Sequence, residues 1–408
     1  MNLRRYIVLV VATMLAVGAW AQNATSSPSS RFGYGELNNN LPGAYRAMGG
    51  VGVGMRSNKV INPAQPASYT ACDSLTFMFD IAGSFLYTNY GDSYGERNRL
   101  NGNLEYVTMQ FPLWRQHIAF SAGVTPYSAV GYNFSLMDSI NSDYHYTHTY
   151  SGEGGFTQVY GGLSFNICNW VALGVNAYYM FGDLTKFRTQ SFNELDVKGA
   201  SQKDYLSISS MRLRYGMQLF HTFGKHTVVL GGVFENKQRF SKSHHEQIET
   251  TTNDTVSIMD NAFELPMMYG AGFSYNYADR LTVALDYQCQ DWTKTIYFDK
   301  EDVLRARQRW ALGVEYRHDP LGRDYIDRVC WRLGANYSNS YAMTTTNVPE
   351  FGLSLGFGMP LRTVATMINL TVEYTHRGAL QQEALSENAL RLVISAAISE
   401  NWFFKRKL

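Results

Sequence analysis

The sequence predicts an all-β protein: a transmembrane antiparallel β-barrel of about 14 strands with an N-terminal plug, or hatch. Three observations lead to this fold class. Apolar residues alternate with small or polar ones at a period of two from about residue 74 onward, the connections alternate between long and short, and aromatic residues make up 14% of the chain. The mean hydropathy of −0.24 therefore averages two surfaces of opposite character.

Composition excludes several other classes. The 408 residues are 45% hydrophobic, only 17% charged, and carry a formal net charge of +1. A disordered chain lacks this aromatic content, and a nucleic-acid-binding surface needs an excess of basic residues. After about the first 20 residues no apolar run approaches the roughly 18 residues of a membrane-spanning helix, which excludes a helical membrane protein.

The first 21 residues have the pattern of a cleaved signal peptide. Arg4 and Arg5 precede an apolar stretch at 7–17, and Ala19 and Ala21 fit the small-residue cleavage rule, so the mature chain is expected to begin at Gln22. The expected location is the cell outer membrane. The first connection between strands is a long one, so both termini are expected on the periplasmic side.

The strand assignment rests on alternation. Between residues 265 and 277, for example, Met267, Tyr269 and Phe273 share one face, while Gly270, Gly272 and the polar residues share the other. Fourteen such segments are predicted, at 74–90, 101–112, 116–134, 155–167, 170–188, 204–223, 226–241, 264–277, 280–297, 306–318, 327–339, 350–360, 364–377 and 388–400.

The connections decide between a barrel and a soluble β-sandwich, which also alternates. Seven long connections alternate with six short ones, as in outer-membrane barrels with short periplasmic turns and longer outer loops. Many segments reach 12 residues or more, longer than typical soluble strands. Trp114, Trp170 and Trp402 lie beside short turns or the chain end, where an interfacial aromatic girdle is expected. The barrel is therefore favoured.

Residues 22–73 do not alternate and are rich in Gly, Asn and Pro, as tightly packed loops are. About fourteen strands enclose a lumen too wide for side chains alone to fill. The prediction is a signal peptide at 1–21, a plug inside the barrel at 22–73 and the barrel itself at 74–408. A loose periplasmic tail is the alternative for the middle part.

Charged residues on the inward parity of the strands are the candidate site residues. On a lipid-facing surface each would cost about 2–4 kcal/mol at mid-membrane, so they are expected to face the lumen. Two roles stay open: opposite charges pair and hold the wall and plug together, or an arginine holds a substrate carboxylate. The lumen-facing candidates are Arg212, Arg214, Glu315, Arg317, Arg332 and Glu373.

Enzymatic motifs are present only in outline. Ser354 lies in a G-x-S-x-G sequence but in mid-strand, without the following helix that a nucleophile needs. His244 and His245 lack the spacing of a zinc motif and fall in a predicted polar loop, and the glycines at 49–54 miss the dinucleotide-binding pattern. No catalytic residue, metal or cofactor is predicted, and a barrel lipase or protease is the least favoured function.

The run NPAQPASY, the GAYRAMGGVGVG that precedes it and the DSLTFMFD that follows resemble the FadL/TodX family of outer-membrane transport proteins. The resemblance implies a hatch whose NPA turn is Asn62, Pro63 and Ala64. It also implies a kink in the third strand at Pro126 and Gly131 that opens the wall sideways, although a simple bulge is the alternative. The aromatic ending ENWFF resembles the strand that the barrel assembly machinery recognises.

The function that the resemblance implies is passive transport of hydrophobic or amphipathic compounds, such as long-chain fatty acids. The partners would be these compounds, outer-membrane lipid and the barrel assembly machinery, with no nucleic acid and with a monomer as the expected state. The alternative is a FadL-like interaction barrel that serves protein secretion, as type IX shuttles do. Transport predicts an apolar pocket beside Asn62–Ala64, which an interaction barrel does not need.

Overall fold

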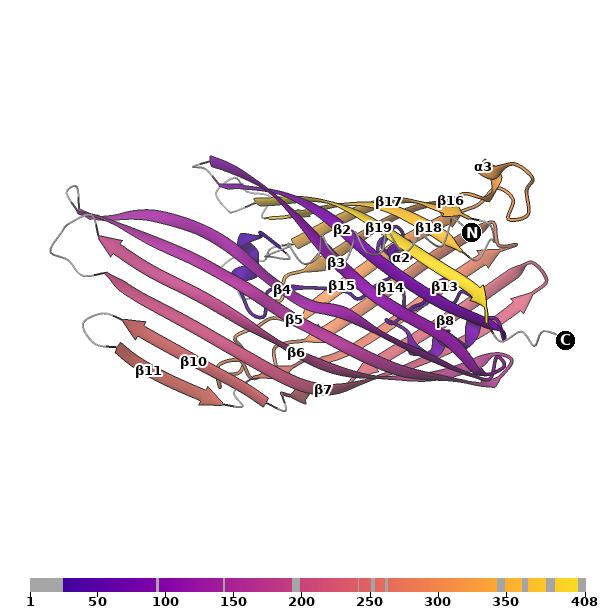
Figure 1. The fold of residues 1–408 in the computed structure, drawn as a ribbon, viewed down its shortest axis with the longest axis horizontal. Helices are drawn as coiled ribbons and strands as arrows, with labels where there is room; N and C mark the ends of the chain where they lie inside the picture. Colours follow the sequence, from indigo (N-terminus) through magenta and orange to yellow (C-terminus); the bar gives the residue numbers. More distant parts are fainter. Residues whose placement is uncertain are drawn as a thin grey trace.

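The computed structural model is a closed antiparallel β-barrel, and it describes residues 25–92, 95–141, 144–192, 199–240, 242–250, 254–260, 263–342, 349–361, 366–378 and 386–402. Each wall strand pairs with its two neighbours in chain order, and the ring closes where β19 pairs with β2. The strands run obliquely around the long axis (Figure 1). The wall strands are β2 (Thr76–Asp92), β3 (Gly95–Trp114), β4 (Ile118–Asn141), β5 (Tyr144–Cys168), β6 (Val171–Phe192), β7 (Ala200–Phe223), β8 (His226–Glu235), β13 (Met267–Tyr277), β14 (Leu281–Asp291), β15 (Arg307–Tyr316), β16 (Cys330–Asn339), β17 (Pro349–Pro360), β18 (Met367–Arg377) and β19 (Ser386–Asn401).

The predicted fold class of a 14-stranded barrel is confirmed. Alternation produces an apolar exterior and a polar interior, as in β13, where Phe273 is exposed and Ser274 is buried. Trp114, Trp170 and Trp402 are exposed at the end of the short turns. Other large apolar side chains exposed on the wall include Leu213, Tyr215, Met217, Leu285, Leu312, Leu333, Leu353 and Leu355. The exterior is that of an outer-membrane barrel.

Several of the predicted long loops, at 91–100, 135–154, 189–203 and 242–263, consist largely of strand among their described residues, which corrects the sequence-based boundaries. β4 and β5 are 24 and 25 residues long, and residues 135–141 and 144–154 continue their ladder instead of forming a loop. The stretch at 242–263, including His244 and His245, forms the hairpin of β10 (Lys242–Thr250) and β11 (Asp254–Asp260), which extends β7. In β4 the alternation continues beyond the predicted boundary, with Tyr132, Phe134 and Leu136 on one face and Asn133 and Ser135 on the other, so the predicted segment ended too early. Figure 1 shows β4–β7, β10 and β11 reaching beyond the rest of the barrel.

Two other predicted strands are shorter in the structure. The segment at 226–241 ends as wall at Glu235, and Gln238–Arg239 (β9) pairs with Glu264–Leu265 (β12) as a separate two-stranded sheet. The segment at 280–297 leaves the wall after Asp291, because Trp292 turns into the lumen and is fully buried. The connection after β15 contains a helical turn, α3 (Tyr325–Arg328).

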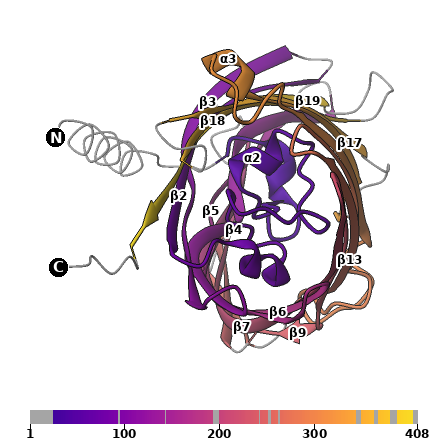
Figure 2. The same ribbon diagram turned by 90° about the vertical axis from the view of Figure 1, so that its right-hand side faces the viewer.

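The N-terminal part of the described chain lies inside the ring of strands (Figure 2). We call residues 25–75 the inner segment. It contains η1 (Pro28–Arg31), the short strand β1 (Glu36–Leu37), α2 (Gly43–Arg46) and η2 (Pro66–Ala71). The predicted signal peptide at 1–21 lies outside the described residues. Among the helices of the described chain, none is long and apolar enough to cross a bilayer.

Candidate functional site

The turn at Asn62–Ala64 is buried and bonded to the wall. The Pro63 carbonyl accepts hydrogen bonds from the Tyr178 hydroxyl at 2.9 Å and from Asn176 Nδ2 at 3.0 Å, both on β6. Asn62 Nδ2 donates to the Gly52 carbonyl at 2.8 Å, which ties the turn to the neighbouring loop of the inner segment. These bonds pair the Pro63 carbonyl and the Asn62 amide nitrogen of this buried turn, while Asn62 Oδ1 has no hydrogen-bond partner among the described residues.

Arg212 and Arg214 of β7 lie beside this turn and share one carboxylate. Arg212 Nη1 is 2.7 Å from Glu235 Oε2, and Arg214 Nε donates to the other oxygen of Glu235. Arg214 Nη1 also reaches the Ala64 carbonyl at 3.4 Å. Most of their donors therefore bind protein acceptors, as in a pairing role, while Arg212 Nε has no hydrogen-bond partner among the described residues.

Glu315, Arg317 and Arg332 form a second cluster toward the end of β15 and the start of β16. Arg332 Nε lies 2.6 Å from Glu315 Oε2, and Arg317 Nη2 lies 3.7 Å from Glu315 Oε1. Arg332 Nη1 donates to Asn369 Oδ1 at 2.8 Å, and Arg317 Nε contacts Cys330 Sγ. All three predicted residues come together here, with both arginines paired to Glu315.

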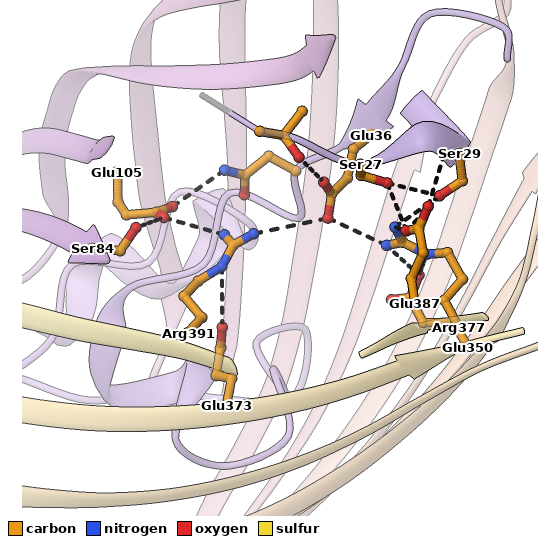
Figure 3. A network of polar contacts seen from close by, with 12 residues as sticks. Ser27, Ser29, Glu36, Ser84, Glu105, Glu350, Glu373, Arg377, Glu387 and Arg391 are labelled. Carbon is orange, nitrogen blue, oxygen red and sulfur yellow. Dashed lines mark hydrogen bonds and ion pairs between the residues drawn. The ribbon is translucent and has the colours of Figure 1, made fainter. Parts of the chain in front are cut away.

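A larger charged cluster fastens the inner segment to four wall strands, and we call it the lock network; Figure 3 labels all of its members except Arg46. It comprises Glu36 of β1, Arg46 of α2, Glu105 of β3, Glu350 of β17, Glu373 and Arg377 of β18, and Glu387 and Arg391 of β19. Arg46 lies 2.7 Å from Glu105 and binds both carboxylate oxygens of Glu373, at 2.8 and 2.9 Å. This bidentate geometry is the strongest form of the arginine–carboxylate pair.

The second half of the lock network holds β1 and η1. Arg377 is 3.2 Å from Glu36, 2.8 Å from Glu350 and 3.3 Å from Glu387. Glu387 also accepts from the Ser27 hydroxyl at 2.6 Å and from the Ser29 N–H at 2.9 Å. Burial alone would raise the pKa of Glu36, but the charges of Arg377 and Arg391 outweigh it and hold the pKa below its usual value.

Backbone contacts complete the attachment of the inner segment. Asp286 of β14 accepts from three successive N–H groups, those of Gly52, Val53 and Gly54, at 2.5, 2.6 and 3.1 Å. Gly49 has φ +70°, and an added Cβ would stand 2.5 Å from the Ala335 carbonyl of the wall, so this approach requires glycine. Ser354, the serine of the G-x-S-x-G sequence, accepts a hydrogen bond from the Gly49 N–H at 2.8 Å.

The wall is incomplete between β3 and β4. The two strands are in register only from Trp114 and Ile118 up to Val107 and Val124, while β4 continues along β5 to Asn141. Pro126, which lacks an N–H, lies just beyond the last pair, at a register shift against β5. Gly131 shows no register shift, and its N–H and carbonyl bond to the Ser30 hydroxyl. We call this interruption the wall gap.

The inner segment partly fills the wall gap. β1 pairs with β4 at Ala129 and Ser128, and the Asn38 N–H donates to the Tyr127 carbonyl at 2.9 Å. A cavity of about 560 Å³ lies beside it. Gly102 and Leu104 of β3 line it on one side of the gap and Pro126 and Ala129 of β4 on the other. Much of the remaining lining is charged: Glu36, Arg46, Glu105, Arg307, Arg309, Glu350, Glu373, Arg377 and Arg391.

The cavity that touches Ala64 is not the apolar pocket that transport predicts beside Asn62–Ala64. The cavity that touches Ala64 has a volume of about 20 Å³, room for about one water molecule. Arg212, Arg214 and several amide side chains line it.

A cluster of the chain's own rings fills part of the lumen. Tyr34 is fully buried in a cluster of apolar and aromatic residues, with its ring centroid 5.2 Å from that of Tyr297 and 5.7 Å from that of Trp292. Phe156 and Phe240 lie at 6.0 and 5.8 Å. The Tyr34 hydroxyl donates to the Glu264 carbonyl at 3.2 Å.

Among the described residues, Ser354 makes no hydrogen bond with a histidine. The same residues contain no group of three or more side chains that could hold a metal ion. The four cysteines, Cys72, Cys168, Cys289 and Cys330, are unbridged.

The sequence-based selection missed much of the lock network. Glu350 and Arg377 lie within the predicted segments 350–360 and 364–377, at the inward parity of Gly352 and Glu373, and Glu387 lies one residue before the segment 388–400, so applying the parity to the ends of the segments would have found them. Glu36 and Arg46 carry no such pattern, because the inner segment does not alternate.

The comparisons with known proteins agree with this fold. The BamG family model matches residues 3–408. By sequence, the chain matches none of the curated proteins compared with it. By structure, it is similar to the CymD monoaromatic hydrocarbon channel, with a TM-score of 0.59 and 12% identity over 91% of this chain and 100% of that one.

Two further solved structures are similar to the same extent. The toluene transporter TbuX of Ralstonia pickettii has a TM-score of 0.60 and 13% identity over 89% of this chain and 99% of its own. A FadL homologue from Pseudomonas aeruginosa has a TM-score of 0.58 and 12% identity over 90% and 100%. These similarities establish a shared fold, and the family model covers nearly the whole chain: the protein belongs to the BamG family and has the fold of FadL-type outer-membrane barrels.

Proposed function

We propose that this protein is an outer-membrane interaction barrel that works with the β-barrel assembly machinery, in which the inner segment is a fixed plug. The observation that carries the proposal is the attachment of the inner segment. Arg46 binds carboxylates of β3 and β18, and Gln65 donates to carbonyls of β7 and β8. Asp286 of β14 binds the loop at Gly52, so the inner segment is attached to opposite parts of the wall. Moving such a segment would separate several buried charge pairs at once, which is costly.

Two further observations support an interaction role. The large cavity is ringed by charges, and an apolar compound inside it would strip water from carboxylates and guanidinium groups without replacing their hydrogen bonds. The Bam prefix of the family name supports the barrel assembly machinery as the partner. The alternative to a transporter that the sequence predicts is an interaction barrel that serves protein secretion. The proposal keeps the interaction role and replaces protein secretion with barrel assembly.

The test is depletion of the protein with two readouts in the same cells. If the protein serves barrel assembly, outer-membrane barrels lose their folded, heat-modifiable form on gels and unfolded precursors accumulate. Uptake of a panel of hydrophobic compounds, including toluene and a long-chain fatty acid, stays unchanged per folded barrel. Normal barrel folding with reduced uptake would refute the proposal.

Passive transport of hydrophobic compounds is the second candidate, and the wall gap is the observation that favours it. The gap adjoins a cavity that residues of both flanking strands line. The similar solved structures include proteins described as toluene and monoaromatic hydrocarbon channels. A substrate of this cavity would need a polar head as well as an apolar part, which points to amphipathic compounds. The uptake arm of the depletion experiment tests it.

A further inference from the structure

The β4 side of the wall gap is a strand edge that already binds extended chain. Going outward along β4, Tyr127 accepts from Asn38, the next two residues pair with β1, and Gly131 bonds to Ser30. The inner segment thus provides a short substitute for β3 and covers the β4 edge as far as Gly131.

The β4 edge continues beyond Gly131. Backbone groups of successive strand residues point to opposite sides, so Asn133, Ser135 and Met137 follow Gly131 and direct N–H and C=O toward the gap. Within the described residues, these backbone groups have no partner strand on that side. All three residues are exposed, and Met137 is 84% exposed.

This edge lacks the usual protection against strand addition. Natural edge strands carry Lys or Pro, or are covered, to prevent pairing with another chain. The sequence from 131 to 137 is GYNFSLM, with no charge and no proline. Its ladder to β5 is regular over the same residues, so the edge is extended strand.

A row of rings lies on the inner side of the same strand pair. The ring centroid of Phe134 is 6.0 Å from that of Tyr132 and 5.4 Å from that of Tyr150, and the Arg31 guanidinium lies 3.8 Å above the Tyr150 ring. A strand added to β4 would place alternate side chains beside Tyr132 and Phe134. Main-chain bonds would then provide affinity and the rings selectivity, as in other strand-addition sites.

We propose that residues 133–137 of β4 are a docking site for an extended segment of a partner protein, which binds by adding a strand at the wall gap. The segment would carry apolar or aromatic side chains at alternate positions. The identity of the partner rests on the proposed function: it is a component of the barrel assembly machinery.

Proline substitutions test the docking site without removing the fold. Asn133→Pro and Ser135→Pro each delete an N–H that faces the gap, and proline is tolerated at such edge positions because the ladder to β5 does not use that N–H. The matched controls are Asn133→Ala and Ser135→Ala, which keep the N–H. Heat-modifiability on gels verifies that each variant folds as a barrel.

The measurement is the amount of the central barrel of the assembly machinery that co-purifies with the tagged, full-length protein from outer membranes in mild detergent. The proline double variant is expected to retain at least about tenfold less than the native chain, while the alanine double variant retains the native amount. A photoreactive benzophenone side chain at position 135 is expected to crosslink to the same barrel, and one at Leu213 on the lipid face is not.

The outcomes separate the two proposals. Equal co-purification of the native and proline chains, with no crosslink at position 135, would overturn the docking site while leaving the proposed function intact. Absence of the assembly barrel from the native preparation would overturn both.

Discussion

Substitution of Arg46 by methionine tests whether the lock network holds the inner segment. Arg46 is 11% exposed and binds Glu105 and Glu373 through three hydrogen bonds of 2.7–2.9 Å. Removing one partner of a buried ion pair costs about 3–5 kcal/mol. Arg391 remains 3.2 Å from Glu105 and 4.0 Å from Glu373 and compensates in part, so the lower end, about 3 kcal/mol, is expected.

The assay is hydrogen exchange of peptides covering residues 40–56, with the barrel in lipid nanodiscs. A loss of about 3 kcal/mol raises the population in which the segment is released roughly 100-fold, and exchange in this segment accelerates accordingly. The wall strands should exchange as in the native protein. Glu373→Gln in the Arg46→Met background should restore part of the protection, because it removes one unpaired buried charge.

The matched control is Arg239→Met. Arg239 also faces a carboxylate, Glu264, at 3.3 Å, but its side chain is 56% exposed, so the loss should stay within about 1 kcal/mol. If Arg46→Met leaves exchange of residues 40–56 at the native rate, the lock network does not hold the inner segment and the reasoning is refuted.

Three other predictions follow from the same structure. Gly49→Ala should destabilise the attachment of the inner segment by about 2 kcal/mol or more, because Gly49 has a positive φ and the new Cβ meets the wall backbone. Gly224→Ala is the control: this residue also has a positive φ, but nothing lies within 4 Å of the new Cβ, so the cost should be only about 1 kcal/mol. Hydrogen exchange compares the two variants. The lowered pKa of Glu36 means that its stabilising contribution is complete above its unfolded pKa, near 4.3, and is lost as the pH falls through its lower folded value. Hydrogen exchange of residues 27–38 should therefore accelerate below about pH 4.5 but not between pH 6 and 8. Glu36→Gln should weaken this pH dependence. Tyr34→Ala should destabilise the barrel by about 3–5 kcal/mol and leave a ring-sized apolar cavity. Toluene should then raise the melting temperature of this variant and not that of the native chain. An equal shift in both proteins would contradict the conclusion that the Tyr34 ring fills the centre of the aromatic cluster.

The fold was predictable because a barrel wall has a simple periodicity. Strands with one lipid-facing side, such as β13, alternate strictly, and the lengths of the connections identified the barrel. The outer halves of β4 and β5 were taken for loops although a period of two continues there, as at Tyr132, Phe134 and Leu136, because polar residues are more frequent in them than in the rest of the wall. Trp292 broke the parity of its predicted strand because the chain leaves the wall at that residue and turns inward.

The candidate site was predictable only in part. Parity identified Glu315, Arg332 and Glu373 as lumen residues, since the lipid face excludes charge. It could not identify the partner of Glu373: Arg46 precedes it by more than 300 residues, in a segment without periodicity. Nor could it locate the wall gap, because the end of the β3–β4 pairing depends on the chain that takes its place, β1.

The most direct test of the central claim is the folding rate of a newly exported outer-membrane barrel after depletion of this protein, followed by pulse–chase and heat-modifiability on gels. A role in barrel assembly predicts that conversion to the folded form slows, and that the native gene restores the rate. An unchanged folding rate together with a lower uptake of hydrophobic compounds would contradict the claim and identify the barrel as a channel.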